Sequence, residues 1–196
     1  MKIAVACDHG GLNLKRALVK FLQSNGHEVM DFGTNTTDSC DYPDFALPAA
    51  ESVASGECER GIVVCSSGIG VSIVANKVPG IRCAHCHDVY CAKYTRYHND
   101  ANMIAFGEKV VGEGMMQEIV TAFLTSEYEG GERHDRRIAK IKAVEEKWNV
   151  PTCPNYSQNS TRSPCIIFFL NVRKQKSSPT YLFKKLHNLT REKTIL

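Results

Sequence analysis

The chain has no apolar stretch of the roughly 20 residues that a membrane-spanning helix needs. Its first residues form a short charged-then-apolar pattern and lack the longer apolar segment of a secretory signal. Both features predict a cytoplasmic protein that does not act at a membrane. With 196 residues, 43% of them hydrophobic, the chain can bury one sizeable core and hardly two. We therefore expect one principal domain.

Two C-x-x-C motifs that could together bind a structural zinc ion are also missing, although the chain contains nine cysteines. Their odd number and irregular spacing favour free thiols over a disulfide framework. The stretch Cys83-Ala84-His85-Cys86-His87 with Cys91 suggests zinc, but a structural zinc site needs a second C-x-x-C pair and Cys91 falls within a predicted helix. We therefore predict that the protein binds no metal.

An excess of basic residues is missing from the first 150 residues, although the whole chain has a net charge of +3. From Pro151 onward there are eight basic residues and one acidic residue, which leaves 16 basic and 20 acidic residues among the first 150. Because the first 150 residues carry a net negative charge, we do not expect them to bind nucleic acid.

Short apolar strands alternate with amphipathic helices over the first 148 residues. This order is typical of a parallel sheet with helices on both faces, because crossover connections are right-handed. We predict an α/β, doubly wound, three-layer sandwich around a five-stranded parallel, Rossmann-like sheet. The expected strands are 2–7, 28–33, 62–64, 81–85 and 103–107; the expected helices are 12–22, 43–55, 71–75, 87–97, 113–124 and 133–148.

The stretch Gly61–Lys77 changes from strand to glycine turn to helix within a few residues. Backbone N–H groups at such a turn can hold a phosphate or a negative charge that develops during a reaction. Cys65 lies at the strand end, where a neighbouring helix N-terminus favours the reactive thiolate. Alternatively, Cys65 is only a small buried residue and Gly68 and Gly70 only close a tight turn. The lysine of a P-loop is missing. The pair Gly68-x-Gly70 is also too short for a dinucleotide fingerprint, which needs a third glycine and an acidic residue about 20 residues later, so no dinucleotide cofactor is predicted.

Ligands of doubly wound sheets bind beyond the carboxyl ends of the strands. Asp8 and His9 follow the first strand, Cys65-Ser66-Ser67 follows the third, and Gly107 ends the fifth. We expect these three segments to converge at one edge of the sheet.

Two further clusters of candidate functional residues follow in the sequence. His98 closes the fourth helix, where a lone histidine is usually a cap that interacts with the helix dipole. The segment Gly130–Arg137 brings two glycines and three arginines to the start of the last helix. Because arginine forks match phosphate oxygens, this cluster favours a phosphorylated substrate.

Taken together, the motifs resemble one known family, that of ribose-5-phosphate isomerase B. They occur in the family's order over about the first 148 residues. The motifs are Cys7-Asp8-His9-Gly10-Gly11, Asp41-Tyr42-Pro43, Cys65-Ser66-Ser67-Gly68-Ile69-Gly70, Ala75-Asn76-Lys77 with Gly80-Ile81-Arg82, His98-Asn99-Asp100 with Asn102, and Glu129-Gly130-Gly131 with Arg133, His134 and Arg137.

The resemblance implies a metal-free, cofactor-free interconversion of ribose 5-phosphate and ribulose 5-phosphate through an enediolate. Cys65 would be the general base that moves a proton between C1 and C2, and His98 with Asp8 would open the furanose ring. The enediolate oxygens would be held by Ser67 and by the amides around Gly68 and Gly70, with Asn99 nearby. In this family the site lies between two subunits, so the resemblance also implies a homodimer.

The phosphate grip implied by the resemblance consists of His9, Arg133 and Arg137, and Tyr42 is expected to contact the substrate. Lys109 stands where many relatives carry an arginine. Lysine keeps the positive charge but lacks the planar pair of N–H donors with which a guanidinium binds phosphate. Two further departures are Ser66, where the family often has glycine, and Glu132, inserted before the Arg-His pair. None of them removes a catalytic group.

Two alternatives to a pentose-phosphate isomerase remain open from the sequence. One is a related isomerase of a hexose phosphate such as allose or galactose 6-phosphate, and the other is a non-catalytic phosphate-binding module. Residues 149–196 do not match the family and are expected to form a basic tail without stable structure. We therefore predict an isomerase domain over residues 1–148.

Overall fold

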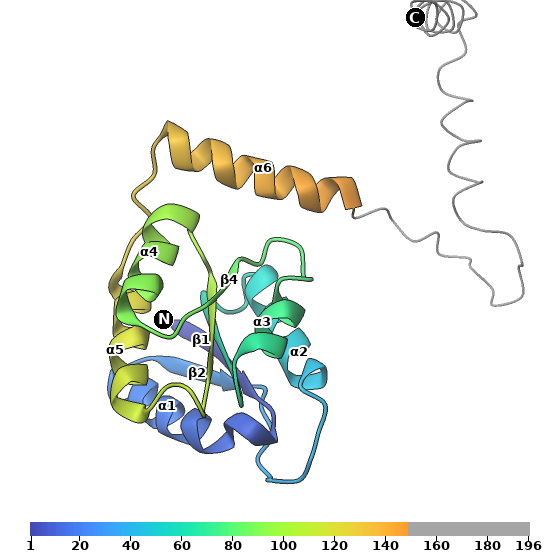
Figure 1. Ribbon diagram of the computed structural model, residues 1–196, viewed down its shortest axis with the longest axis vertical. Coiled ribbons are helices and arrows are strands. Elements are labelled where there is room, and N and C mark those ends of the chain that lie inside the picture. The colour runs from blue at the N-terminus through green and yellow to red at the C-terminus, as the bar shows by residue number, and fades with distance from the viewer. Residues whose placement is uncertain (149–196) are drawn as a thin grey trace, which may run out of the picture. The chain divides into compact units, whose positions relative to one another are not determined.

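The computed structural model describes residues 1–148 and arranges them in three layers, with helices on both faces of a central sheet (Figure 1). The sheet has five parallel strands in the order β2-β1-β3-β5-β4. They are β1 (Lys2–Cys7), β2 (Glu28–Asp31), β3 (Arg60–Cys65), β4 (Cys83–His85) and β5 (Met103–Gly107). The predicted doubly wound, Rossmann-like fold is confirmed.

Six α-helices and one short 3-10 helix connect and follow the strands within residues 1–148. They are η1 (His9–Gly11), α1 (Leu12–Ser24), α2 (Pro43–Ala54), α3 (Ile69–Ala75), α4 (Val89–Asn99), α5 (Glu113–Thr125) and α6 (Glu132–Trp148). None of these helices is both long and apolar enough to cross a membrane. The expectation for residues 149–196 lies outside the described part of the chain.

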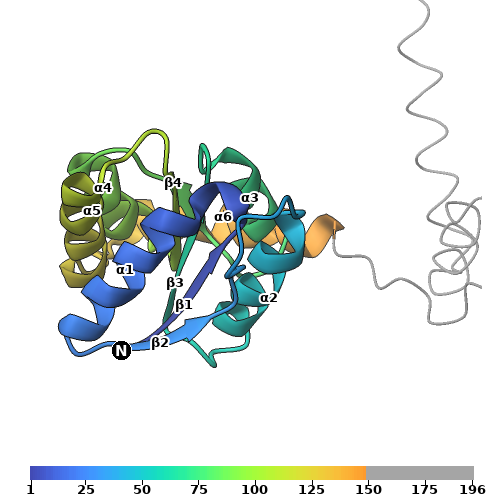
Figure 2. The same cartoon turned by 90° about the horizontal axis from the view of Figure 1, so that it is seen from below.

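The two faces of the sheet carry different kinds of side chain. Helices α1, α4 and α5 pack on one face, against Ile3, Val5 and other large residues. Helices α2 and α3 pack on the other face (Figure 2), where the strand residues Ala4 and Ala6 meet the alanines of α2. Small side chains on both surfaces let α2 lie close to the sheet. Cys65 belongs to this second face.

Several element boundaries differ from the sequence prediction, and side-chain hydrogen bonds explain them. Strand β2 ends at Asp31, whose Oδ1 accepts from the Gly33 N–H at 2.8 Å. Helix α4 begins two residues later than predicted, because the Asp88 carboxylate caps it by accepting from the Cys91 N–H at 2.7 Å. Strand β4 excludes Arg82, whose N–H donates to Asn102 Oδ1 at 2.9 Å.

The seven cysteines of the described residues are free thiols, as expected. Burial raises the pKa of Cys7 to about 12 and that of Cys86 to about 12, and it also raises the pKa of Cys83. These three thiols are therefore poor nucleophiles at neutral pH.

Candidate active site

The loop between β3 and α3 holds the Cys65 thiol at the carboxyl edge of the sheet. Cys65 is only 6% exposed, and its Sγ accepts from the Gly68 N–H at 3.0 Å. Gly68 has φ +82, and a Cβ at this position would lie 2.6 Å from the backbone carbonyl carbon of Phe106. Only glycine fits both conditions, and its amide is thereby directed at the sulfur. A thiolate at this position would be stabilised by that N–H group.

Strand β5 and the end of β4 support the same loop from the other side. The N–H groups of Glu108 and Lys109 donate to the carbonyls of Cys65 and Ser66 at 2.9 and 3.1 Å. His85 Nε2 lies 2.8 Å from the Ser67 carbonyl, which can only accept, so this nitrogen carries the proton. The loop that carries Cys65 is thus held by the backbone on one side and by an imidazole on the other.

The segment after β1 reaches the same place. Asp8 is 8% exposed, and its Oδ1 caps η1 by accepting from the Gly10 N–H at 2.9 Å. A Cβ on Gly10 would meet Ser66 Oγ at 2.2 Å, so the β1 and β3 loops touch. The predicted convergence of these segments at the carboxyl edge is present in the structure.

Two exposed side chains complete this edge. The imidazole of His9 accepts at Nδ1 from the Cys40 N–H at 3.2 Å. The ring of Tyr42 lies over Gly70, where a Cβ would come within 2.8 Å of the ring. The loop before α2 therefore brings its residues to the same edge as Cys65.

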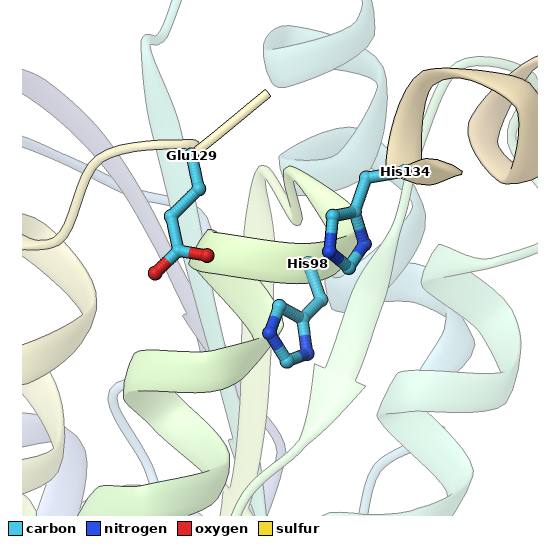
Figure 3. A group of neighbouring side chains, drawn as sticks. All are labelled: His98, Glu129 and His134. Atoms are coloured by element: carbon cyan, nitrogen blue, oxygen red, sulfur yellow. The ribbon is translucent and has the colours of Figure 1, made fainter. Parts of the chain in front are cut away.

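A second cluster lies around the C-terminal end of α4. The rings of His98 and His134 stack with centroids 4.5 Å apart and planes inclined by 12°, and Tyr94 contacts His98 edge-on at 5.0 Å. Figure 3 shows the two imidazoles next to each other, with Glu129 approaching from the loop that precedes α6. Ligand atoms of His98, Glu129 and His134 lie within 4.8 Å of one another, close enough to raise the question of a metal ion.

The surroundings of this cluster favour an anion over a metal cation. Arg133 Nη2 lies 3.1 Å from His134 Nε2, and because a guanidinium only donates, it engages the lone pair that a metal would need. Burial lowers the pKa of His134, and the nearby charges of Arg133, His98 and Arg137 lower it further. Beside the single carboxylate of Glu129, the side chains around His134 thus carry mainly positive charge, which suits a phosphate group better than a divalent ion.

The predicted site residues fall into two groups within one chain. Helix α4 starts at the carboxyl edge and runs back, so that its end lies beside the amino end of β4, where Arg82 Nε donates to the Asn99 carbonyl at 2.9 Å. At the carboxyl edge lie Asp8, His9, Tyr42, Cys65, Ser67, Gly68, Gly70 and Lys109; at the amino edge lie His98, Asn99, Arg133 and Arg137.

The strand register sets the distance between the groups. Cys65 pairs with Gly107, whereas Gly61, four residues earlier, pairs with Met103 at the amino edge. Four residues of strand span about 13 Å. Hence one chain does not bring His98 or the arginines to Cys65.

The sequence prediction assigned no role to two residues of the site. His85 supports the loop that carries Cys65, and its position at the carboxyl end of β4 is the feature of the sequence that could have indicated this role. His134 stacks on His98 although the two lie 36 residues apart, so no local pattern reveals the contact.

A family model described as Ribose/Galactose Isomerase matches residues 3–141. The chain belongs to the ribose/galactose isomerase family. One relative in this family is ribose-5-phosphate isomerase B of Escherichia coli, which is 46% identical over 148 residues, or 76% of this chain and 99% of the relative.

Solved structures of ribose/galactose isomerases superpose on the described fold. Ribose-5-phosphate isomerase B of Clostridium thermocellum has a TM-score of 0.74 and 54% identity, and the match covers 76% of this chain and 99% of that one. The enzyme of Mycoplasma genitalium, solved with bound ribulose 5-phosphate, has a TM-score of 0.71 and 37% identity, over 74% and 97% of the two chains. The family resemblance inferred from the motifs is therefore confirmed.

Proposed function

We propose that this chain is a ribose-5-phosphate isomerase that interconverts ribose 5-phosphate and ribulose 5-phosphate. The observation that carries the proposal is the buried Cys65 thiol, held by the Gly68 N–H on a loop at the carboxyl edge of the sheet. Two relatives that match almost their whole length are isomerases of this substrate, and a third structure holds ribulose 5-phosphate. We place the reaction in the pentose phosphate pathway of the cytoplasm.

The chemistry follows from the two groups of residues. Cys65 takes the proton from one of the two carbons and returns it to the other, and Ser67 stabilises the enediolate oxygens that form between the two steps. The Gly68 N–H donates to the Cys65 sulfur and is therefore not free to bind the substrate. The neighbouring amide N–H groups of the loop would donate to the enediolate oxygens instead. No step of this mechanism uses a metal or a cofactor.

Ring opening and phosphate binding need residues from both edges of the sheet. Asp8 and His9 are on the side of Cys65, whereas His98, Arg133 and Arg137 are not. We therefore propose a homodimer, in which His98 of the partner subunit faces Asp8 and the partner's two arginines join His9 and Lys109 around the phosphate. Exposed apolar residues support an interface: Ile69, Ile73, Ile141, Val144 and Trp148, the last 72% exposed.

A cleft of about 530 Å³ lies between α6 and the body of the chain. Asn99, Ile141 and Val144 are among its lining residues, so the cleft adjoins the amino-edge group and has an apolar wall. Its position fits the proposed contact with a second subunit.

The deciding experiment is a coupled assay that compares ribose 5-phosphate with allose 6-phosphate and galactose 6-phosphate in the presence of EDTA. We expect turnover of the pentose phosphate to exceed that of both hexose phosphates and to be unaffected by the chelator. Preference for a hexose phosphate would replace the proposed substrate, and turnover that requires added metal would overturn the mechanism.

We further propose that residues 1–148 form the whole isomerase domain. The family model ends at residue 141, before the basic tail begins. A chain cut after Trp148 should therefore keep its fold and turnover. Loss of solubility or of activity on truncation would show that residues 149–196 contribute to the domain.

A further inference from the structure

One buried charge lies outside the machinery described above. Lys15 of α1 is 1% exposed, and burying an ammonium is costly unless its donors are all satisfied. Its Nζ has three partners: Asp31 Oδ2 at 2.7 Å, the Thr34 carbonyl at 2.9 Å and Asn35 Oδ1 at 3.1 Å. An ammonium has three donors, so each N–H has an acceptor.

All three partners belong to the end of β2 and to the loop that follows it, residues 32–42, which we call the β2–α2 loop. Arg16, the next residue of α1, donates from Nη2 to the Asn35 carbonyl at 3.2 Å. Asp31 uses its other oxygen to accept from the Gly33 N–H at 2.8 Å. The start of the loop is thus bound to the Lys15 ammonium. Burial of this ammonium is stable only when the loop supplies its hydrogen-bond acceptors.

The far end of the same loop reaches the candidate site. The Cys40 N–H donates to His9 Nδ1 at 3.2 Å, which makes Nδ1 the acceptor and places the proton of a neutral ring on Nε2. Two residues later, the Tyr42 ring covers Gly70. The loop therefore fixes the tautomer of His9 and the position of Tyr42.

We propose that Lys15 is a positioning residue for the phosphate side of the site, acting through the β2–α2 loop on His9 and Tyr42. This inference rests on the proposed function in one respect, namely that His9 and Tyr42 contact the substrate. Lys15 touches neither of them, and its effect is to hold the loop that does.

The test compares Lys15→Met with Lys20→Met, which removes an exposed lysine of the same helix. Methionine keeps the apolar stem of Lys15, and Asp31, with a side chain 32% exposed, can be hydrated when its partner is lost. The first readout is the ¹⁵N spectrum of the His9 imidazole under alkaline conditions, with His9→Gln to assign its signals. We expect a single Nε2–H tautomer in the wild type and in Lys20→Met, and a mixture of tautomers in Lys15→Met.

The second readout separates positioning from simple destabilisation. A fraction of unfolded enzyme lowers kcat and leaves KM unchanged. We expect Lys15→Met to raise KM for ribose 5-phosphate about tenfold, with kcat within about twofold, and to weaken inhibition by inorganic phosphate in parallel. Wild-type KM and a single His9 tautomer in folded Lys15→Met would overturn the proposal.

A milder variant keeps the test decisive if Lys15→Met does not fold. Asn35→Ala removes one acceptor from an exposed loop position, and Thr37→Ala is its control on the same loop. We expect about a threefold rise in KM for Asn35→Ala alone. An unchanged KM would then contradict the proposal. A wild type that does not isomerise ribose 5-phosphate would refute the proposed function, whereas the tautomer spectra would still decide the role of Lys15.

Discussion

At the scale of single residues, the structure separates Cys65 from the other thiols at the same edge. Cys7 ends the neighbouring strand and is equally buried, but burial raises its pKa to about 12 and it donates to the Thr34 carbonyl. Cys65, in contrast, accepts a hydrogen bond from a backbone amide. The Cys65 sulfur is thus a hydrogen-bond acceptor at the carboxyl edge, whereas the Cys7 sulfur is a donor.

Cys65→Ala is expected to lower kcat by about 10²–10⁴-fold while substrate affinity changes little, because it removes the proposed general base and leaves the proposed phosphate contacts in place. Cys58→Ala is the matched control, since Cys58 is buried in the same hydrophobic cluster but precedes β3. The measurement is steady-state kinetics with ribose 5-phosphate. Wild-type kcat in Cys65→Ala would mean that the base lies elsewhere.

Arg137→Ala should raise KM more than it lowers kcat, because it removes the proposed charge-assisted contact to the phosphate and leaves the proposed proton transfer intact. Arg136 is the adjacent control, an exposed residue that lies 3.7 Å from Glu132 in an i,i+4 ion pair. Arg136→Ala should leave both constants near wild type. If the two substitutions changed KM and kcat equally, the proposed role of Arg137 in phosphate binding would be wrong.

At the scale of elements, the turn between β3 and α3 decides the geometry of the site. Its backbone passes so close to β5 that a Cβ on Gly107 would lie 2.5 Å from Ser67 Cα. Glycine is therefore required on both sides of this approach, at Gly68 in the turn and at Gly107 at the end of β5. This close approach allows the carbonyls of Cys65 and Ser66 to accept from the residues after β5.

Gly68→Ala tests that turn against Gly56→Ala, because the two glycines have nearly the same backbone φ angle. The φ angles are +82 and +80, but nothing lies within 4 Å of a Cβ on Gly56. Both variants should lose about 1–2 kcal/mol of unfolding free energy from the left-handed conformation. Gly68→Ala should lose more than that and also lower kcat, because its Cβ displaces the amide from the Cys65 sulfur. Denaturant unfolding and kinetics measure both effects, and identical behaviour of the two variants would contradict the argument.

At the scale of the whole molecule, the parallel sheet places the two groups of site residues at opposite edges. Each helix that follows a strand returns the chain to the amino edge, so residues near the end of α4 are necessarily far from those at the end of β3. The proposed homodimer would resolve this separation by forming each site from two copies of the chain.

Subunit complementation tests the shared site directly. Cys65→Ala and His98→Asn homodimers, each nearly inactive, should regain about a quarter of wild-type activity after subunit exchange, because half of the dimers are mixed and each mixed dimer has one intact site. Mixing Cys65→Ala with Asp8→Ala should give no recovery, since both residues lie on the same edge. Absence of recovery in the first mixture, with exchange verified, would contradict the proposed dimer.

Stability should fall as the pH drops from about 7.5 to about 5.5. In each case burial is the main cause that lowers the pKa of His27, His87 and His134 below the usual 6.5. A histidine with a lowered folded pKa stays neutral in the fold while the unfolded chain takes up a proton, so stability is lost as the pH falls through 6.5 toward the folded pKa. Thermal unfolding at both pH values measures the slope, and replacing the three histidines by asparagine should flatten it.

The sequence by itself determined the order of strands and helices and the local motifs. Apolar runs such as Ile62–Val64 and the glycines after Cys65 act through contacts between near neighbours, so their pattern is visible without a structure. It also determined that Asp8, Cys65 and Gly107 meet, because strands of a parallel sheet share one carboxyl edge.

Only the tertiary structure decided which way single groups point and which distant groups touch. The stacking of His98 on His134, the hydrogen bond of Gly68 to the Cys65 sulfur and the closure of the β2–α2 loop over Lys15 depend on packing between separate elements. The separation of His98 from Cys65 likewise follows from the length and direction of α4 relative to the sheet, which no local motif contains. Such contacts are long-range, and their geometry exists only once the sheet and its helices have packed.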